Sequence, residues 1–305
     1  MGAQESPEQR EPLDLVGAVV VITGAGSGIG RALAVRFAAE GARAVVCTDR
    51  DGPDNDETVA LITEAHGDDA VTAVAHTLDV GDERAIEQVV TDTIDRFGRI
   101  DVFVSNAGYG LRGGLDLPTD EWIEMMNVHT WSHLAAARAV IPGMIEQGGG
   151  YLLNTASAAG LLTQMDSGPY AVSKHAAVAL AEWLAITYGE QGIGVSVLCP
   201  QAVRTNIIAK AKRNPATRSG SGRSGSASGS SGGPSDGPRG RQAAGDGVLE
   251  ADEVADSCIE AMRAGRFLVL PHPEVETYFQ RKAGDYDRWL RGMRRFRARL
   301  SGGSG

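Results

Sequence analysis

A glycine-rich segment between a strand-like run and a helix-like run constrains the fold of this chain more than any other feature. In "VVVITGAGSGIGRALAVRFAAEGA" a β-branched run leads into Gly24, Gly26, Gly28 and Gly30, and a helical pattern follows at once. Glycines alone would indicate only a tight turn. Because this turn opens a helix, whose first N–H groups carry a partial positive charge, it also predicts a site where the backbone closely approaches a phosphate.

The run before this turn is the first in a regular alternation of strand and helix patterns. Helix-like segments begin near Gly28, Asp56, Asp82, Pro118, Pro169 and Ala251. Short β-branched runs cover 18–23, 43–48, 70–80, 100–105, 150–157, 194–200 and 266–271. Such runs, apolar on both faces, are typical of a parallel sheet with helices on both sides. We expect an α/β Rossmann fold with a doubly wound parallel sheet of about seven strands and its ligand at their carboxyl ends.

The end of the second strand-like run bears on the ligand. In "VVCTDRD", Asp49 lies 19 residues after Gly30. A carboxylate at this strand end accepts hydrogen bonds from the ribose hydroxyls of NAD and repels the 2′-phosphate of NADP. The neighbouring Arg50 could pair with that phosphate instead. We therefore expect a dinucleotide cofactor, with NAD favoured and NADP left open.

An insertion rich in serine and glycine interrupts the alternation. Between 218 and 240, 16 of 23 positions are Ser or Gly, which leaves few apolar side chains to offset the entropy of ordering the chain. Only about 60 residues follow, too few for a second core. We expect one domain over 13–300 with a disordered insertion at about 214–245, and flexible tails at 1–12 and 301–305.

Composition argues against several classes of partner. A net charge of -10 disfavours a nucleic acid, which binds basic surfaces. No apolar run approaches the ~18 residues of a membrane span, and the first residues do not have a signal-peptide pattern. Cys47, Cys199 and Cys258 lack CxxC spacing and lie in apolar contexts, which predicts buried free thiols. We expect a cytoplasmic protein with no membrane and no nucleic-acid partner.

A tyrosine and a lysine stand four positions apart in "GPYAVSKHAAVAL", at the start of an alanine-rich helix pattern. Residues at this spacing point to the same side of a helix, so Tyr170 and Lys174 could contact one ligand together. Taken alone, the pair could equally be a core tyrosine and a surface lysine.

Three motifs stand in order along the chain: "TGAGSGIG" at 23–30, "SNAG" at 105–108 and "YAVSK" at 170–174. With them the chain resembles the short-chain dehydrogenase/reductase family over about residues 13 to 210, and more loosely from 248 onward. The resemblance implies an NAD(P)-dependent oxidoreductase that interconverts a secondary alcohol and a ketone by hydride transfer. It implies much less about the substrate.

The resemblance also implies the site residues. Asn127, Ser157, Tyr170 and Lys174 match the catalytic group, with Tyr170 as general base or acid. The implied cofactor contacts are Thr23, Gly24, Ser27, Gly28, Ile29, Gly30, Asp49, Arg50, Asp79, Val80, Asn106, Ala107, Gly108, Tyr170, Lys174, Pro200, Val203 and Thr205. The chain departs from the family pattern at Ser105, commonly Asn, and at Gln201, commonly Gly. Gln201 brings a large polar side chain close to the nicotinamide.

The substrate pocket is expected to be apolar. The expected lining is Ser157 together with Leu161, Leu162, Met165, Ile207 and Ile208, which favours a bulky or aromatic alcohol or ketone. The small residues after Lys174 would let two copies of this helix approach closely, as is common in the family, so we expect a homodimer or homotetramer. Two alternatives stay open: a cofactor-binding sensor or scaffold without catalysis, and an epimerase or dehydratase with a retained nicotinamide.

The last helix pattern and the histidines are less easily assigned. In "DYDRWLRGMRRFRARL" the residues Trp289, Met293, Phe296 and Leu300 share one face, which we expect to be buried in the core or against another subunit. A helix on a membrane surface is the alternative. His129 and His133 have the i, i+4 spacing of a metal-ligand pair, but no third ligand clusters with them, so we expect no metal. His272 either lines the pocket or ends a strand, and His175 points away from Tyr170.

Overall fold

The computed structural model describes residues 13–67, 70–205 and 246–302, with side chains as far as Arg299. Seven parallel strands form one sheet in the order β3-β2-β1-β4-β5-β6-β7. The strand order reverses between β1 and β4, and at such a point the loops after the two strands turn to opposite faces and leave a crevice. The doubly wound α/β prediction is confirmed.

All seven predicted runs form strands. They are β1 (Val19–Thr23), β2 (Ala44–Asp49), β3 (Thr72–Thr77), β4 (Val102–Ser105), β5 (Gly150–Thr155), β6 (Ile193–Leu198) and β7 (Leu268–Val269). The edge strands β3 and β7 are shorter than the predicted runs at 70–80 and 266–271. An edge strand has a neighbour on one side only, and so its ladder ends where pairing with that neighbour ends.

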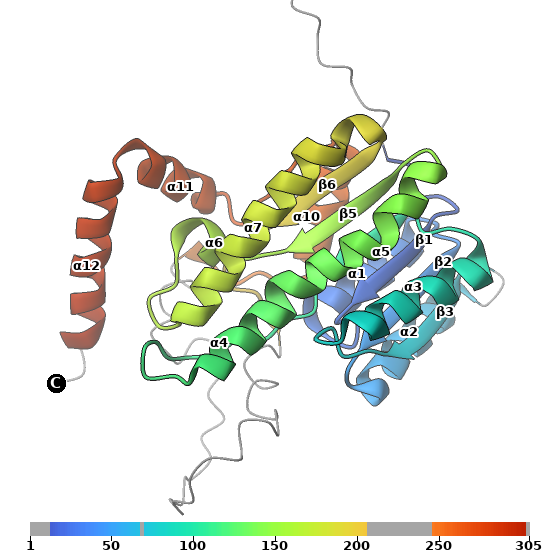
Figure 1. Cartoon of the computed structure of the whole chain (residues 1–305), viewed down its shortest axis with the longest axis horizontal. Helices are drawn as coiled ribbons and strands as arrows, with labels where there is room; N and C mark the ends of the chain where they lie inside the picture. The colour runs from blue at the N-terminus through green and yellow to red at the C-terminus, as the bar shows by residue number, and fades with distance from the viewer. Residues whose placement is uncertain (1–12, 68–69, 206–245, 303–305) are drawn as a thin grey trace, which may run out of the picture.

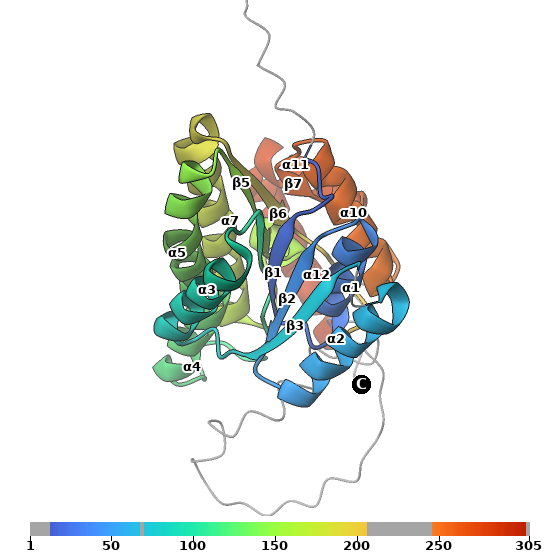
Figure 2. The same cartoon turned by 90° about the vertical axis from the view of Figure 1, so that its right-hand side faces the viewer.

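Helices cover both faces of the sheet, as Figure 2 shows. One face carries α3 (Glu83–Phe97), α4 (Thr119–Met126), α5 (Ser132–Glu146) and α7 (Gly168–Tyr188), and the other carries α1 (Gly28–Ala39), α2 (Gly52–His66) and α10 (Ala251–Arg263). A π-helical turn η1 (Asn127–Trp131) joins α4 to α5, and a 3-10 turn η2 (Gly189–Gln191) follows α7. The predicted start of α2 near Asp56 is wrong: Asp51 and Pro53 begin the helix earlier, because proline suits its first turn.

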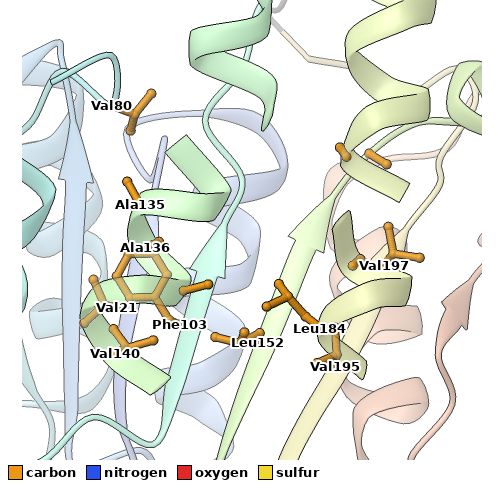
Figure 3. Packing of buried hydrophobic residues seen from close by; sticks show 14 of the residues in the cluster. Val21, Val80, Phe103, Ala135, Ala136, Val140, Leu152, Leu184, Val195 and Val197 are labelled. Atoms are coloured by element: carbon orange, nitrogen blue, oxygen red, sulfur yellow. The ribbon is translucent and has the colours of Figure 1, made fainter. Parts of the chain in front are cut away.

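Two apolar clusters, one on each face, make up the core. Figure 3 shows the first, where Phe103 of β4 and Leu152 of β5 lie among Val140 of α5 and Leu184 of α7. The second packs α1, α2 and α10 on the opposite face. The three cysteines are free and buried, as predicted.

After β5 a short helix, α6 (Ala158–Leu162), leads toward α7, and after β7 the chain continues as α11 (Glu274–Gly284) and α12 (Tyr286–Gly302). In Figure 1, α11 lies next to α6, and α12 stands beyond it at the edge of the molecule. The predicted insertion at 214–245 and the tail at 1–12 lie outside the described residues. No helix among the described residues has the length and apolar character needed to span a bilayer.

Candidate active site

The carboxyl ends of β1, β2, β4 and β5 open into one cavity of about 760 Å³. This volume lies within the range of small-molecule and cofactor sites. Most of the predicted site residues line it: Gly24, Ser27, Gly28, Ile29, Asp49, Arg50, Asp79, Val80, Asn106, Ala107, Gly108, Ser157, Tyr170, Lys174, Pro200, Val203 and Thr205. The motifs that are far apart in the sequence therefore meet in one place.

The glycine turn forms a cradle that side chains would fill. Gly24 has a φ of +70°, and a Cβ there would lie 2.8 Å from the Cα of Ala107. A Cβ on Gly30 would overlap the carbonyl oxygen of Gly24. The turn opens α1, whose first N–H groups lie beside the cavity, so the cradle suits an anionic pyrophosphate.

Two predicted cofactor contacts support this cradle instead of lining it. Gly30 packs against the turn, and Thr23 is buried beneath it. The Thr23 Oγ1 accepts hydrogen bonds from the backbone N–H groups of Asn106 (2.9 Å) and Ala107 (3.0 Å). The Asn106 side chain donates to the Thr23 carbonyl at 3.0 Å. These bonds join the ends of β1 and β4, so Thr23 and Gly30 act on the site through its shape.

Asp49 lies at the end of β2 with its carboxylate between the turn and α2. It accepts hydrogen bonds from the backbone N–H groups of Gly26 and Asp51, both at 3.0 Å. A carboxylate has about four acceptor positions, and a carboxylate at this strand end can accept hydrogen bonds from the ribose hydroxyls of a dinucleotide. Arg50 lines the same part of the cavity and is exposed.

The first turns of α7 present Tyr170 and Lys174 to the cavity. Ser167 caps this helix by accepting a hydrogen bond from the Tyr170 N–H at 3.3 Å. The Lys174 Nζ donates to the carbonyl of Thr155 at 2.8 Å and lies 5.9 Å from the centroid of the Tyr170 ring. Burial lowers the pKa of Lys174 to about 7. A charged ammonium at this place would favour the phenolate form of Tyr170.

Ser157 begins α6 at the end of β5. Its Oγ accepts a hydrogen bond from the Ala159 N–H at 3.1 Å and donates to the Pro200 carbonyl at 3.4 Å. The second bond is long and therefore weak. The hydroxyl can exchange it for a bond to a ligand oxygen.

His129 belongs to the site, although the sequence indicated only a metal-ligand spacing. Its ring is fully buried and lies edge-on to the Tyr170 ring, with centroids 5.4 Å apart. Its Nε2 accepts from the Tyr109 N–H at 3.1 Å, so Nδ1 carries the proton and donates to the Ser173 Oγ at 3.0 Å. Ser173 donates in turn to the Tyr170 carbonyl at 3.1 Å. Burial lowers the pKa of His129 well below 6.5, which keeps it neutral.

This chain of hydrogen bonds holds the Tyr170 turn in place and occupies both ring nitrogens of His129. Neither nitrogen is left for a metal, and the described residues contain no group of three or more His, Cys, Asp or Glu that could hold one. The signal in the sequence was weak, because a buried polar histidine is recognised only once Tyr109 and Ser173 are known to lie beside it.

Asn127 does not lie where the resemblance suggested. It begins the π-helical turn η1 and lines a smaller cavity with Trp131 and Arg138, and the described lining of the main cavity does not include it. A π turn holds an extra residue, which changes the direction in which its side chains point. Two residues of this turn line the main cavity, Val128 and His129, and the His129 ring packs against Tyr170.

The predicted substrate lining needs correction. Of the two expected leucines, Leu162 lines the cavity, whereas Leu161 packs in the core, because successive residues of α6 point in different directions. Met165 is absent from the described lining, and Ile207 and Ile208 lie outside the described residues. Gln201 does line the cavity.

The remaining histidines lie outside the described lining. His272 is buried after β7, and its Nδ1 accepts from the Gln201 N–H at 3.3 Å, so it supports the loop after β6. The His175 Nδ1 lies 2.8 Å from the Ala171 carbonyl.

The carboxyl-terminal helices supply a wall that the sequence did not predict. We define the C-terminal wall as the residues of α11 and α12 that line the cavity: Tyr278, Arg281, Trp289, Met293, Phe296 and Arg299. The apolar face of α12 was expected to be buried in the core or against another subunit. In this chain, Trp289, Met293 and Phe296 face the cavity and are only half-buried.

Comparisons with known proteins agree with this geometry. A family model described as short chain dehydrogenase matches residues 18–216. Levodione reductase of Leifsonia aquatica is 37% identical over 214 residues, which cover 68% of this chain and 76% of the relative. The 1-deoxy-11-beta-hydroxypentalenate dehydrogenase of Streptomyces avermitilis is 34% identical over 263 residues, 84% of this chain and 85% of the relative. A crystal structure of a short chain dehydrogenase/reductase from Burkholderia phymatum in complex with NAD has a TM-score of 0.77 at 30% identity and covers 90% of this chain and 96% of that one.

Proposed function

This chain belongs to the short chain dehydrogenase family, and from that premise we propose that it interconverts a secondary alcohol and a ketone with NAD as the preferred dinucleotide. Tyr170 is the general base or acid, and the substrate is a bulky apolar or aromatic molecule. The observation that carries the proposal is that Ser157, Tyr170 and Lys174 line one cavity with the glycine turn.

The residues of the cavity fit the dinucleotide. The cradle of Gly24 and Gly28 would hold the pyrophosphate, Asp49 the adenosine ribose, and Lys174 the nicotinamide ribose. A bound dinucleotide would supply the hydride acceptor for oxidation of the alcohol and, in its reduced form, the hydride donor for reduction of the ketone.

The protein's own residues move the proton and hold the substrate oxygen. A free phenol has a pKa of ~10 and is a poor base at neutral pH. With Lys174 charged, the phenolate form of Tyr170 is favoured, and Tyr170 Oη can take the hydroxyl proton of an alcohol. In the reverse direction Tyr170 gives the proton to the ketone oxygen, while the Ser157 hydroxyl keeps that oxygen in place.

Replacing the phenol tests the assignment. We expect Tyr170→Phe to lower kcat by about 10²- to 10⁴-fold, because the general acid and base is removed, and to leave the Kd for NADH within about twofold. The assay follows NADH absorbance with cyclic, aryl and steroid ketones, and NADH binding is followed by fluorescence. Tyr188→Phe, at the far end of the same helix, is the matched control. Unchanged turnover in Tyr170→Phe would contradict the assignment.

The preference for NAD is tested at Asp49. Its carboxylate would repel the 2′-phosphate of NADP. Once that charge is removed, the neighbouring Arg50 could attract the phosphate. We expect Asp49→Asn to shift the ratio of kcat/KM for NAD over NADP toward NADP by about tenfold or more. Asparagine still has a carbonyl oxygen that can accept from the Gly26 N–H, so the turn is disturbed little. An unchanged ratio would show that another residue selects the cofactor.

We also propose that the protein forms a homodimer or homotetramer through α7 in the cytoplasm. Val172, Trp183 and Ile186 of this helix are 51%, 52% and 83% exposed in the single chain. Together with the small Ala176 and Ala179 they form one apolar stripe at helical spacing.

A further inference from the structure

The C-terminal wall lines the same cavity as the glycine turn, and its chemistry indicates a substrate class. We propose that this wall binds the non-reacting end of the substrate and selects a large apolar alcohol or ketone that carries an anionic group. The inference rests on the proposed oxidoreductase function, and it adds a requirement that the catalytic residues do not impose.

The wall is held in a defined place relative to the catalytic residues. Lys282 of α11 is only 7% exposed and donates to the carbonyl of Leu161 at 2.5 Å. Leu161 belongs to α6, the helix that Ser157 begins. Tyr278 donates to the Asp246 carboxylate at 2.9 Å. Figure 1 shows the result, with α11 beside α6 and α12 beyond it.

One part of the C-terminal wall is an apolar face on α12. Trp289, Met293 and Phe296 stand at i, i+4 and i+7 on α12, so they form one continuous face. That face lines the cavity and is only half-buried. Large apolar side chains beside an open cavity are stabilised when a ligand excludes water from them. Two aromatic rings and a thioether match an extended apolar body more than a sugar.

The C-terminal wall also carries positive charge. Arg281 of α11 and Arg299 near the carboxyl end of α12 both line the cavity, and among the described residues neither forms an ion pair. The described carboxylate that is hydrogen-bonded to this wall, Asp246, already accepts from Tyr278. The other carboxylates in the described lining, Asp49 and Asp79, belong to the cofactor contacts.

The wall therefore presents two guanidinium groups beside an aromatic face, and Arg299 lies 6.0 Å from the Phe296 ring centroid. Guanidinium groups bind carboxylate, sulfonate and phosphate oxygens with well-matched geometry. In a chain with a net charge of -10, a wall that carries two arginines also favours the approach of an anion to that wall.

A pair of fluorescent probes tests the apolar face and the arginines of the wall separately. The full-length protein, saturated with NAD, is titrated with 8-anilino-1-naphthalenesulfonate and with N-phenyl-1-naphthylamine, which has the same ring system without the sulfonate. We expect the double variant R281Q/R299Q to raise the Kd of the anionic probe about tenfold and that of the neutral probe less than about twofold. Met293→Asp should raise the Kd of both probes, because it places a charge within the apolar face.

The matched control is R291Q/R294Q, which removes the same charge from positions of α12 that are absent from the described lining. This control should leave both Kd values within about twofold. If both double variants raised the Kd of the anionic probe equally, the proposal would be overturned, since only the total charge of the C-terminal helices would then matter. An equal rise in the Kd of both probes in R281Q/R299Q would also overturn it, as would no binding of either probe to the wild type.

The titration does not depend on turnover. Tyr170→Phe should bind the anionic probe as the wild type does. If the proposed oxidoreductase function fails, the wild type turns over no ketone, and the probe titration still reports on the wall.

Discussion

His133 shows how a single buried residue can make stability depend on pH. Its side chain is 2% exposed, and neither ring nitrogen has a hydrogen-bond partner among the described residues. Burial, with a smaller contribution from the charge of Lys174, lowers the pKa of His133 to about 3. An unfolded histidine has a pKa of ~6.5. Between these values the unfolded chain binds a proton that the folded chain does not, so the free energy of unfolding falls as the pH drops.

We predict that His133→Leu makes the protein more resistant to acid. The free energy of unfolding of the wild type falls as the pH drops from 6.5 to 5. Removing the titrating group should reduce the slope of this fall by up to about 1.4 kcal/mol per pH unit. At pH 7.5 the variant should be at least as stable as the wild type, because leucine has no polar atoms to leave unpaired. Urea denaturation at several pH values measures both effects, with His66→Gln at the end of α2 as the control. Parallel pH profiles of wild type and His133→Leu would contradict the explanation.

Among the helices, α6 is short and ends in a strained conformation. Its five residues, Ala158–Leu162, follow the capping residue Ser157, and Thr163 closes the helix by donating its N–H to the Ala159 carbonyl at 3.0 Å. Thr163 has a φ of +84° and a ψ of 167°, a conformation that essentially only glycine adopts without strain. Because Thr163 and Gln164 line the cavity, the strain lies at the substrate side of the site.

We predict that Thr163→Gly stabilises the protein. Relief of the strain, about 1–3 kcal/mol, exceeds the entropy that glycine adds to the unfolded chain, about 0.5–1 kcal/mol. Thr163→Ala removes the hydroxyl but keeps the Cβ, and should show no comparable gain. Urea denaturation measures the difference, and kcat/KM should fall in Thr163→Gly, since the segment that shapes the cavity gains freedom. A loss of stability in Thr163→Gly would refute the assignment of strain.

Some parts of the site can be predicted from the sequence, and others cannot. The strands and the glycine turn were predictable, because burial on both faces and the steric need for glycine at Gly24 are local properties. Which of Leu161 and Leu162 lines the cavity was not predictable, since it depends on how α6 is rotated against the core. The direction of Asn127 depends on a π turn that leaves no pattern in the sequence.

The same limit applies to α12, whose apolar face the sequence did not place beside the cavity. An apolar face at Trp289, Met293 and Phe296 has the same spacing whether it packs on a core, on another subunit or along a cavity. The place of α11 next to α6, held by Lys282, is what brings this face to the cavity in the single chain.

For the molecule as a whole, the apolar stripe of α7 bears on assembly. α7 covers one face of the sheet, so its inner side is committed to the core and its outer side is open in the single chain. The cavity opens at the carboxyl ends of the strands, and Tyr170 and Lys174 lie in the first two turns of the same helix. A partner packed on the outer side of α7 would therefore hold the catalytic turn from behind.

We predict that Ile186→Glu lowers the molar mass of the protein in solution. Two-fold symmetry places each residue of the stripe in the contact twice, so one substitution inserts two carboxylates into an apolar interface. Size-exclusion chromatography with light scattering should give a dimer or tetramer for the wild type and a smaller species for the variant. Leu61→Glu, which changes an exposed apolar residue of α2 on the other face of the sheet, should leave the mass unchanged. A monomeric wild type, or the same mass for Ile186→Glu and wild type, would show that α7 does not form the interface. Because the interface would support the Tyr170 turn, the dissociated variant should also lose kcat while retaining its Kd for NADH.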